Sequence, residues 1–354
     1  MTLPLHLVWS VLRSRLLLFV PVFLMTVSSV VAQVASSNVS QIEFWLLSES
    51  ERKSTLVSAL VERQKVLREN VEYLAETSFA NHQFADGQIG EVVDGSSMFT
   101  RSHYWQMDKS YRMEIKRDPL GLSGRPNEHI ITALSADSGV VRSIGHLRGV
   151  PKQFARIDTN EETIVESDRY RYWLDGEHSP KAEFLLRCIT DRASDLHLEK
   201  GSSDETVVVT APWRPIYKRT DVGTRTFTLD IAKGFMPVSG RAEWREGEKW
   251  RTEEFTVRDF IHSDDFWMPI DITEVITASP GGPSLAAVYR TKVHLVRFGA
   301  VTEKDLKLEF PSGAEVVDAT RGVFYSVGEN DEPIGPVKSL LGGPPIGISP
   351  RETR

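Results

Sequence analysis

The sequence predicts an α+β fold that is mainly β, with one large antiparallel sheet covered on one face by helix. Three observations predict it. Between Glu205 and Arg297, several segments alternate apolar and polar residues, and this period of two gives each strand one apolar and one polar face. A long charged segment before the first strand has apolar residues at helical spacing. No Pro/Gly/Ser linker separates the early strands from the late ones, which favours one continuous sheet over two domains.

The late segments show the alternation most clearly. In residues 225–231 (RTFTLDI), Phe227, Leu229 and Ile231 fall on one side and polar residues on the other. Strands are expected in this region at 206–210, 225–231, 240–245, 249–258, 266–276 and 287–298.

The early segments supply a helix and then further strands. A helix is expected from Ser50 to about Thr77, because Leu56, Leu60, Val61, Leu67, Val71 and Leu74 recur at helical spacing. The change of period after Phe79 predicts strands at 79–84, 91–93, 97–108, 111–117, 129–134 and 140–146. An irregular insertion follows near 151–203, with a short helix at 166–174 and a strand at 180–188.

Residues 1–32 have the pattern of a secretory leader. Arg13 and Arg15 precede an apolar run that ends in small residues, and cleavage is expected after Ala32. The run is short for a membrane span and Pro21 interrupts it, so no stable span is expected after processing. The predicted location is the periplasm or the exterior.

The end of the chain is predicted to leave the main domain, which spans residues 33–300. Residues 301–328 are expected to form a β-hairpin extension. The Gly- and Pro-rich stretch 329–354 is expected to be a flexible tail.

Charge and composition exclude several classes of function. The formal net charge is −7, and it becomes −9 without the leader, because Arg13 and Arg15 are its only charged residues. An acidic protein is a poor candidate for nucleic-acid binding. A single cysteine, Cys188, excludes an intramolecular disulfide and a cysteine-rich metal site. The sequence also lacks the usual phosphate-binding and catalytic motifs, so no cofactor, metal or catalytic residue is expected.

Two polar runs resemble functional sites but have simpler explanations. The densest set of metal-ligand residue types has the composition of a solvated loop: Asp191, Asp195, His197 and Glu199. The run at 262–265 (HSDD) lies between two expected strands and has the composition of a turn. Neighbouring residues rarely form a catalytic triad, since its side chains must converge from separate elements.

An apolar stripe along the late strands is the strongest candidate site. The stripe has two interpretations: a core packed under a helix, or an apolar hollow for a lipid or acyl chain. The residues expected to line it are Phe227, Leu229, Ile231, Trp244, Phe255, Met268, Ile270, Ile272 and Val293.

The late strands also resemble the outer-membrane lipoprotein carrier and sorting (LolA-like) superfamily. The similar segments are TFTLDIAKGFMPVSGRAEW and, after it, WRTEEFTVRDFIHSDDFWMPIDI. The leader and the expected helix before the first strand add to the resemblance. The resemblance implies an unclosed β-barrel, a strongly curved antiparallel sheet with helices on its concave side. It also implies binding of acyl chains. The insertion near 151–203 and the extension after 300 depart from the family in length.

These observations leave three interpretations of function. The first is an envelope binding protein that holds a lipid or an acylated protein in the apolar hollow. Lipoprotein sorting is one role that this interpretation covers. The second is an envelope module with a packed core that binds a protein partner or signals. The third is a hydrolase with its site in the loops at 178–199 or 262–265.

Overall fold

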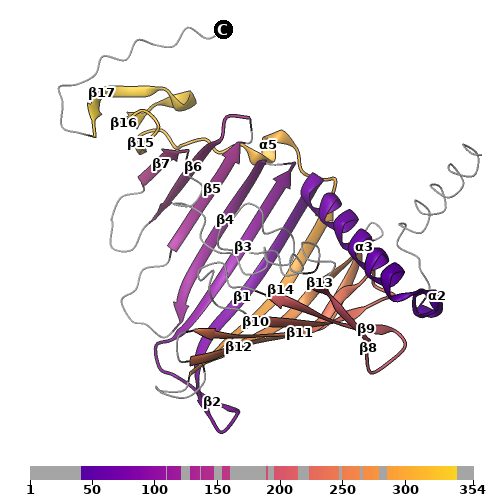
Figure 1. Ribbon diagram of the computed structural model, residues 1–354. Coiled ribbons are helices and arrows are strands. Elements are labelled where there is room, and N and C mark those ends of the chain that lie inside the picture. Colours follow the sequence, from indigo (N-terminus) through magenta and orange to yellow (C-terminus); the bar gives the residue numbers. More distant parts are fainter. Residues whose placement is uncertain are drawn as a thin grey trace, which may run out of the picture.

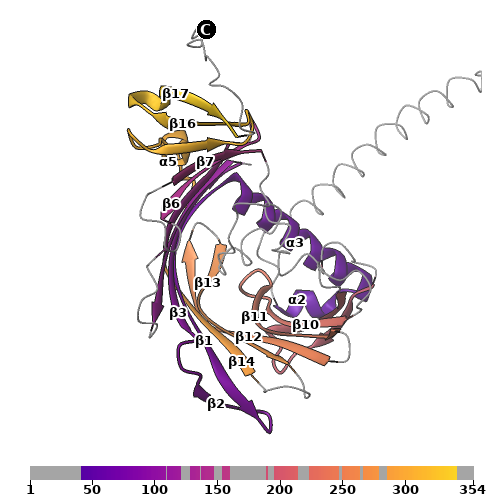
Figure 2. The same cartoon turned by 90° about the vertical axis from the view of Figure 1, so that its left-hand side faces the viewer.

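One open, strongly curved sheet dominates the computed structural model of this protein (Figures 1 and 2). The structure describes residues 41–108, 110–120, 128–135, 137–146, 154–159, 189, 195–213, 223–246, 249–263, 266–278 and 285–340. The expected leader, most of the insertion near 151–203 and residues 341–354 lie outside this part of the chain.

The described residues form a single sheet of seventeen strands. All neighbours are antiparallel except β7 and β15, which run parallel. The end strands β8 and β17 pair with one neighbour each within the described chain, so the sheet is unclosed, as predicted. Across the sheet, the strands follow one another in this order: β8 (His197–Lys200), β9 (Thr206–Trp213), β10 (Gly223–Asp230), β11 (Met236–Glu246), β12 (Lys249–Ser263), β13 (Phe266–Ala278), β14 (Leu285–Phe298), β1 (Asn70–Ala85), β3 (Ser97–Met107), β4 (Ser110–Leu120), β5 (Glu128–Ser135), β6 (Val140–His146), β7 (Phe154–Asp158), β15 (Glu315–Asp318), β16 (Val323–Val327) and β17 (Pro333–Ser339). The short strand β2 (Gln88–Val92) pairs with the far end of β1.

The sheet bends so that its two faces differ. Figure 2 shows α2 (Gln41–Leu46) and α3 (Glu49–Glu69) on the concave side, which we call the inner face. On β1, Val71, Tyr73 and Ala75 point to this face and are fully buried. The alternate residues Glu72 and Glu76 lie on the convex outer face. The period of two in the sequence therefore separates an apolar inner face from a polar outer one.

Helix α3 packs on the inner face through a narrow stripe. Leu56, Leu60 and Leu67 are at most 1% exposed and belong to the same core cluster as the inner strand residues. Arg63, at 5% exposed, occupies the fourth position of this stripe. Their spacing of three or four residues puts all four on one side of the helix.

The boundaries of α3 differ from those expected. The helix begins at Glu49, one residue before the expected start, because Ser48 is the N-cap and forms a capping box with Glu51. It ends at Glu69 rather than near Thr77, because β1 starts at Asn70. Residues after Leu67 fit both helical and strand spacing, and pairing of β1 with β3 and β14 on either side selects the strand.

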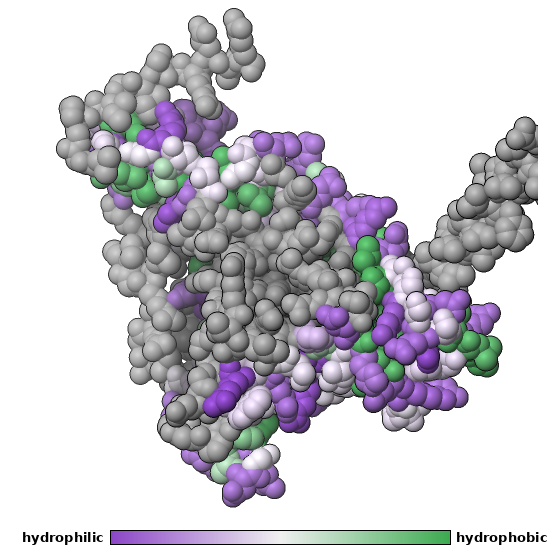
Figure 3. Space-filling view, in the orientation of Figure 1, coloured by the Kyte–Doolittle hydropathy of each residue, from purple (hydrophilic) through white to green (hydrophobic). Residues whose placement is uncertain are grey.

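Helix α2 has one buried and two exposed apolar side chains. Phe44 is fully buried and its ring lies 5.2 Å from that of Phe235, centroid to centroid. Ile42 and Leu46 are 74% and 80% exposed. Figure 3 shows green apolar surface at this end of the molecule.

The C-terminal extension forms a second core on the outer face. After the short helix α5 (Glu303–Leu306), Leu308, Phe310 and Val316 pack with Ala133 and Ile144 of the main sheet. Strand β15 continues the sheet by pairing with β7. The residues expected to begin a mobile tail instead form a short 3-10 helix η4 (Glu329–Asp331) and strand β17, which pairs with β16.

Candidate functional site

The predicted lining residues do meet on the inner face. Phe227, Leu229, Ile231, Phe255, Met268, Ile272 and Val293 are all between 0% and 7% exposed and lie in one cluster with residues of α2 and α3. Ile270 is partly buried and packs against the same cluster. The stripe predicted from the sequence is thus a continuous apolar surface across β10 to β14, and helix α3 belongs to the layer that covers it.

Trp244 shares this face but lies outside the cluster. It is half-buried and stands two residues along β11 from Ala242, which is 1% exposed. Gly240, on the same strand, provides room for the Phe255 ring of the core. A Cβ added to Gly240 would lie 2.3 Å from Cε1 of that ring. The ring of Phe227 is 6.2 Å from the Phe255 ring, centroid to centroid.

Beyond α3 the inner face continues as a half-exposed apolar surface, which we call the inner floor. It consists of Phe79, Met98, Trp244, Ile276 and Tyr289, all of intermediate burial. The Phe79 and Tyr289 rings are 4.8 Å apart between centroids, because their residues pair directly across β1 and β14. Phe79, Met98 and Tyr289 were not among the residues expected to line the site, although the alternation of their strands carries the same signal.

Ion pairs between described residues also lie on the inner face. Arg225 Nη2 lies 2.9 Å from Glu253 Oε1, with side chains 7% and 18% exposed. Arg117 and Glu128 form a second pair on the other flank, at 3.5 Å. Desolvation of a buried ion pair costs free energy that the attraction between its charges only partly offsets. These groups make the inner face amphipathic rather than uniformly apolar.

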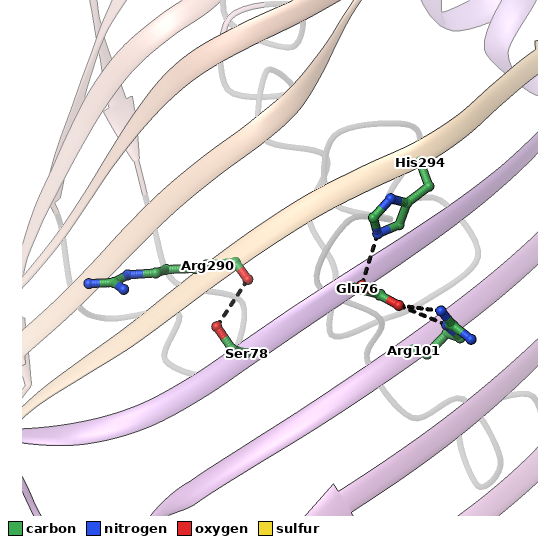
Figure 4. A network of polar contacts seen from close by, with 5 residues as sticks. All are labelled: Glu76, Ser78, Arg101, Arg290 and His294. Carbon is green, nitrogen blue, oxygen red and sulfur yellow. Dashed lines mark hydrogen bonds and ion pairs between the residues drawn. The ribbon is translucent and has the colours of Figure 1, made fainter.

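The outer face carries cross-strand polar networks instead of apolar side chains. Figure 4 shows Glu76 on β1 between His294 on β14 and Arg101 on β3. His294 Nε2 lies 2.9 Å from Glu76 Oε2, and Arg101 Nε donates to Glu76 Oε1 at 2.9 Å. Burial by itself would raise the pKa of Glu76, but the hydrogen bonds from His294 and Arg101 outweigh it and hold that pKa below 4.5.

The lowered pKa of Glu76 predicts a loss of stability in acid. Its contribution is fully present above the pKa of glutamate in the unfolded chain, about 4.3, and is lost as the pH falls through the lower folded value. The free energy of unfolding of the Glu76→Gln variant should therefore decline less between about pH 6 and about pH 3.5 than that of the parent. Urea denaturation at the two pH values measures the difference. An equal decline in both proteins would contradict the assignment.

Two clefts lie on the outer side, between the sheet and the segment around α5. The larger has a volume of about 580 Å³ and is lined by Met107, Asp108, Ser110, Ala133, Leu134, Ser135, Asp137, Ser138, Val140, Arg142, Glu303, Leu306, Lys307 and Leu308. The smaller, of about 350 Å³, is lined by Arg112, Ile131, Ile144, Lys304, Lys307, Leu308, Glu309 and Pro311. Arg112 fixes the segment between them by donating to the carbonyl oxygens of Asp305 and Lys307.

The polar runs noted in the sequence lie only partly within the described residues. His197 contacts Glu199 at 2.9 Å, and both side chains are well exposed. Asp191 and the acidic pair at 264–265 fall outside the described residues. Among the residues that are described, no three His, Cys, Asp or Glu side chains group as metal ligands.

Comparison with known proteins gives a distant likeness. No family model and no curated protein matches this chain. A solved structure described as the Pseudomonas aeruginosa MucA/MucB complex aligns at 10% identity and a TM-score of 0.19, over 70% of this chain and 99% of that one. A second, described as MucB in complex with MucA(peri), aligns at 9% identity and a TM-score of 0.18, with the same coverage. Scores this low carry no argument about function. In the described part of this chain, no helix has the length and hydropathy to cross a membrane.

Proposed function

We propose that this protein is a non-enzymatic binding protein of the cell envelope that holds a lipid or an acyl chain on the inner face of its sheet. One observation carries the proposal: the apolar inner face extends past the stripe of α3 into the half-exposed inner floor. This floor is the part of the apolar inner face whose side chains are only partly buried. The resemblance to the lipoprotein carrier superfamily adds the acylated end of a lipoprotein as a ligand, and an envelope protein as a partner.

The chemistry of the inner face suits an amphiphile. Burial of each methylene contributes about 0.8 kcal/mol, so an acyl chain with about ten buried methylenes gains useful affinity from apolar contact alone. The pair Arg225–Glu253 places charged groups beside the apolar surface, where the polar end of an amphiphile is better tolerated than its chain. Since α3 occupies the upper part of the face, a long chain must share that space with Leu56 and Leu60 or displace them.

A second function has its own support. The seven buried lining residues already pack in one cluster with residues of α2 and α3, so in this conformation the upper inner face is a core. A protein-interaction or signalling module with a permanently filled core would show this packing. The two functions differ in whether the inner floor binds an apolar molecule.

Two tryptophans provide a matched test of the first function. Trp244 lies on the inner floor, whereas Trp250, 53% exposed, lies on the outer face of the neighbouring strand β12. We expect Trp244→Ala to weaken the binding of a fluorescent fatty acid roughly fivefold to tenfold, because it removes a large apolar contact. Trp250→Ala should leave binding unchanged. Fluorescence titration of both variants measures the effect, with melting temperatures to confirm folding.

Native mass spectrometry of protein from an envelope fraction completes the test. Copurified lipid, together with the selective effect of Trp244→Ala, supports the binding protein. If the parent retains no lipid and does not bind the fatty acid, the packed-core module is the better function. Equal affinities of the two tryptophan variants would exclude the inner floor as the binding surface.

A further inference from the structure

The outer face of the central strands carries an ordered array of charges, which we call the outer band. It belongs to the strands β14, β1, β3 and β4, with flanking groups from β13 and β5, and lies on the side of the sheet away from α3. Its members are the cations Arg101, Arg112, Lys116, Arg290, Lys292 and Arg297, the carboxylates Glu72, Glu76, Glu114, Asp118 and Asp271, and the histidines His103, His129 and His294.

The cations of the outer band are outermost and its carboxylates are recessed. The Arg297 side chain is 60% exposed, against 13% for its partner Glu72. Arg101 is 54% exposed, against 22% for Glu76. Five of the six cations are exposed, whereas all five carboxylates are only partly exposed. A molecule that approaches this face therefore meets positive charge first, although the protein as a whole carries a net charge of −7.

Two cations of the outer band differ from the others in their contacts. Arg290 and Lys292 are exposed, and neither forms an ion pair within the described part of the chain. In Figure 4, the Arg290 guanidinium points away from the Glu76 network, and its backbone oxygen accepts from Ser78. These two side chains are available to an external anion.

We infer that the outer band docks the protein onto an anionic lipid surface. The cations lie on β14, β3 and β4, which with β1 between them span a width of about 14 Å at the usual strand spacing, so they form a two-dimensional array rather than a line. Anionic headgroups diffuse laterally and can gather beneath such an array. Basic groups close to an anionic bilayer are attracted in this way.

The shape and the aromatic content of the band favour lipid over an acidic polypeptide. The outer face is convex (Figure 2), and the two clefts on this side lie near α5, where Arg112 of the band lines the smaller one. Arg290 and Lys292 line neither of these clefts. A peptide or folded partner generally needs a groove or a complementary patch, whereas a bilayer needs neither. Trp105 also lies on this face, stacked on His103 at 3.7 Å between ring centroids. Tryptophan is favoured at the level of lipid headgroups.

Cosedimentation with vesicles tests the inference directly. We expect the full chain to bind phosphatidylglycerol vesicles at about 10 mM salt and to be released at about 1 M, where the Debye length falls from about 30 Å to about 3 Å. Phosphatidylcholine vesicles should bind the protein weakly at both salt concentrations. An apolar N-terminal segment that inserts into lipid would give binding that salt does not reverse, so the salt-sensitive fraction is the relevant quantity.

A matched pair of charge reversals locates the surface. Arg290→Glu with Lys292→Glu should weaken salt-sensitive binding by at least about tenfold. The control, Arg258→Glu with Lys338→Glu, changes the net charge equally at two exposed positions outside the outer band and should have little effect. The inference would be overturned if both double variants lost salt-sensitive binding equally, or if the parent protein did not bind phosphatidylglycerol vesicles. Binding of poly-glutamate without vesicle binding would instead assign the band to an acidic polypeptide. None of these variants touches the inner face, so the result is independent of the proposed ligand.

Discussion

Replacement of Phe227 by alanine is expected to lower the free energy of unfolding by about 3–5 kcal/mol. The Phe227 side chain is fully buried at the centre of the inner face, where it meets Phe255, and Arg225 lies 5.9 Å from its ring centroid. Truncation removes the burial of a whole aromatic ring and leaves a cavity, because β10 is held on both sides by β9 and β11 and cannot collapse into the space. Guanidinium denaturation followed by circular dichroism measures the loss.

The same substitution on the outer face serves as the control. Phe99 lies on β3 and is only partly buried, so Phe99→Ala should cost much less than Phe227→Ala, about 1 kcal/mol. This comparison separates the contribution of the inner core to the free energy of unfolding from the general effect of removing a phenylalanine from a strand. If both variants lost the same stability, the inner face would not be the main core of the sheet.

The phenylalanine comparison also bears on the ligand. A strongly destabilised Phe227→Ala protein that regains stability when a fatty acid is added would show that the ligand fills the new space. Lack of such rescue is compatible with a ligand confined to the inner floor. The Trp244 and Trp250 variants then decide whether the floor binds at all.

The fold was predictable where alternation and burial agree. Phe227, Leu229 and Ile231 alternate with polar residues over a whole strand, and one face of that strand is buried. The helix boundary was not predictable, because Val71 and Leu74 continue the helical repeat while Val71, Tyr73 and Ala75 fit the alternation of a strand. Only pairing with β3 and β14, distant in sequence, decides between them.

The candidate site shows the same division. Its apolar members follow from the local period, but the partners of charged residues depend on strand register. Glu76 and His294 are 218 positions apart, and they meet because β1 lies between β3 and β14. The late strand β17 was missed for a different reason. Its Pro333, Gly335 and Pro336 resemble a flexible tail in composition, yet prolines are tolerated at the free edge of a sheet.

Substitution of Val316 by aspartate is expected to unfold the C-terminal extension while the main sheet stays folded. Val316 is fully buried in the second core, and an aspartate there places an unpaired charge among Leu308, Phe310 and Tyr325. Such a group destabilises by several kcal/mol, which exceeds what a small cluster of this size supplies. The inner core shares none of these residues and should keep its stability.

The neighbouring residue gives an internal control for this prediction. Val317 is on the opposite face of β15 and is only partly buried, so Val317→Asp should change stability by about 1 kcal/mol or less. Limited proteolysis distinguishes the two variants: cleavage within 301–339 should accelerate in Val316→Asp alone, while a fragment that contains the main sheet persists. Collapse of the whole protein in Val316→Asp would mean that β15 is required at the edge of β7, because an unpaired β7 would expose its backbone hydrogen-bonding groups to other chains. The main sheet would then depend on the C-terminal extension for its folding.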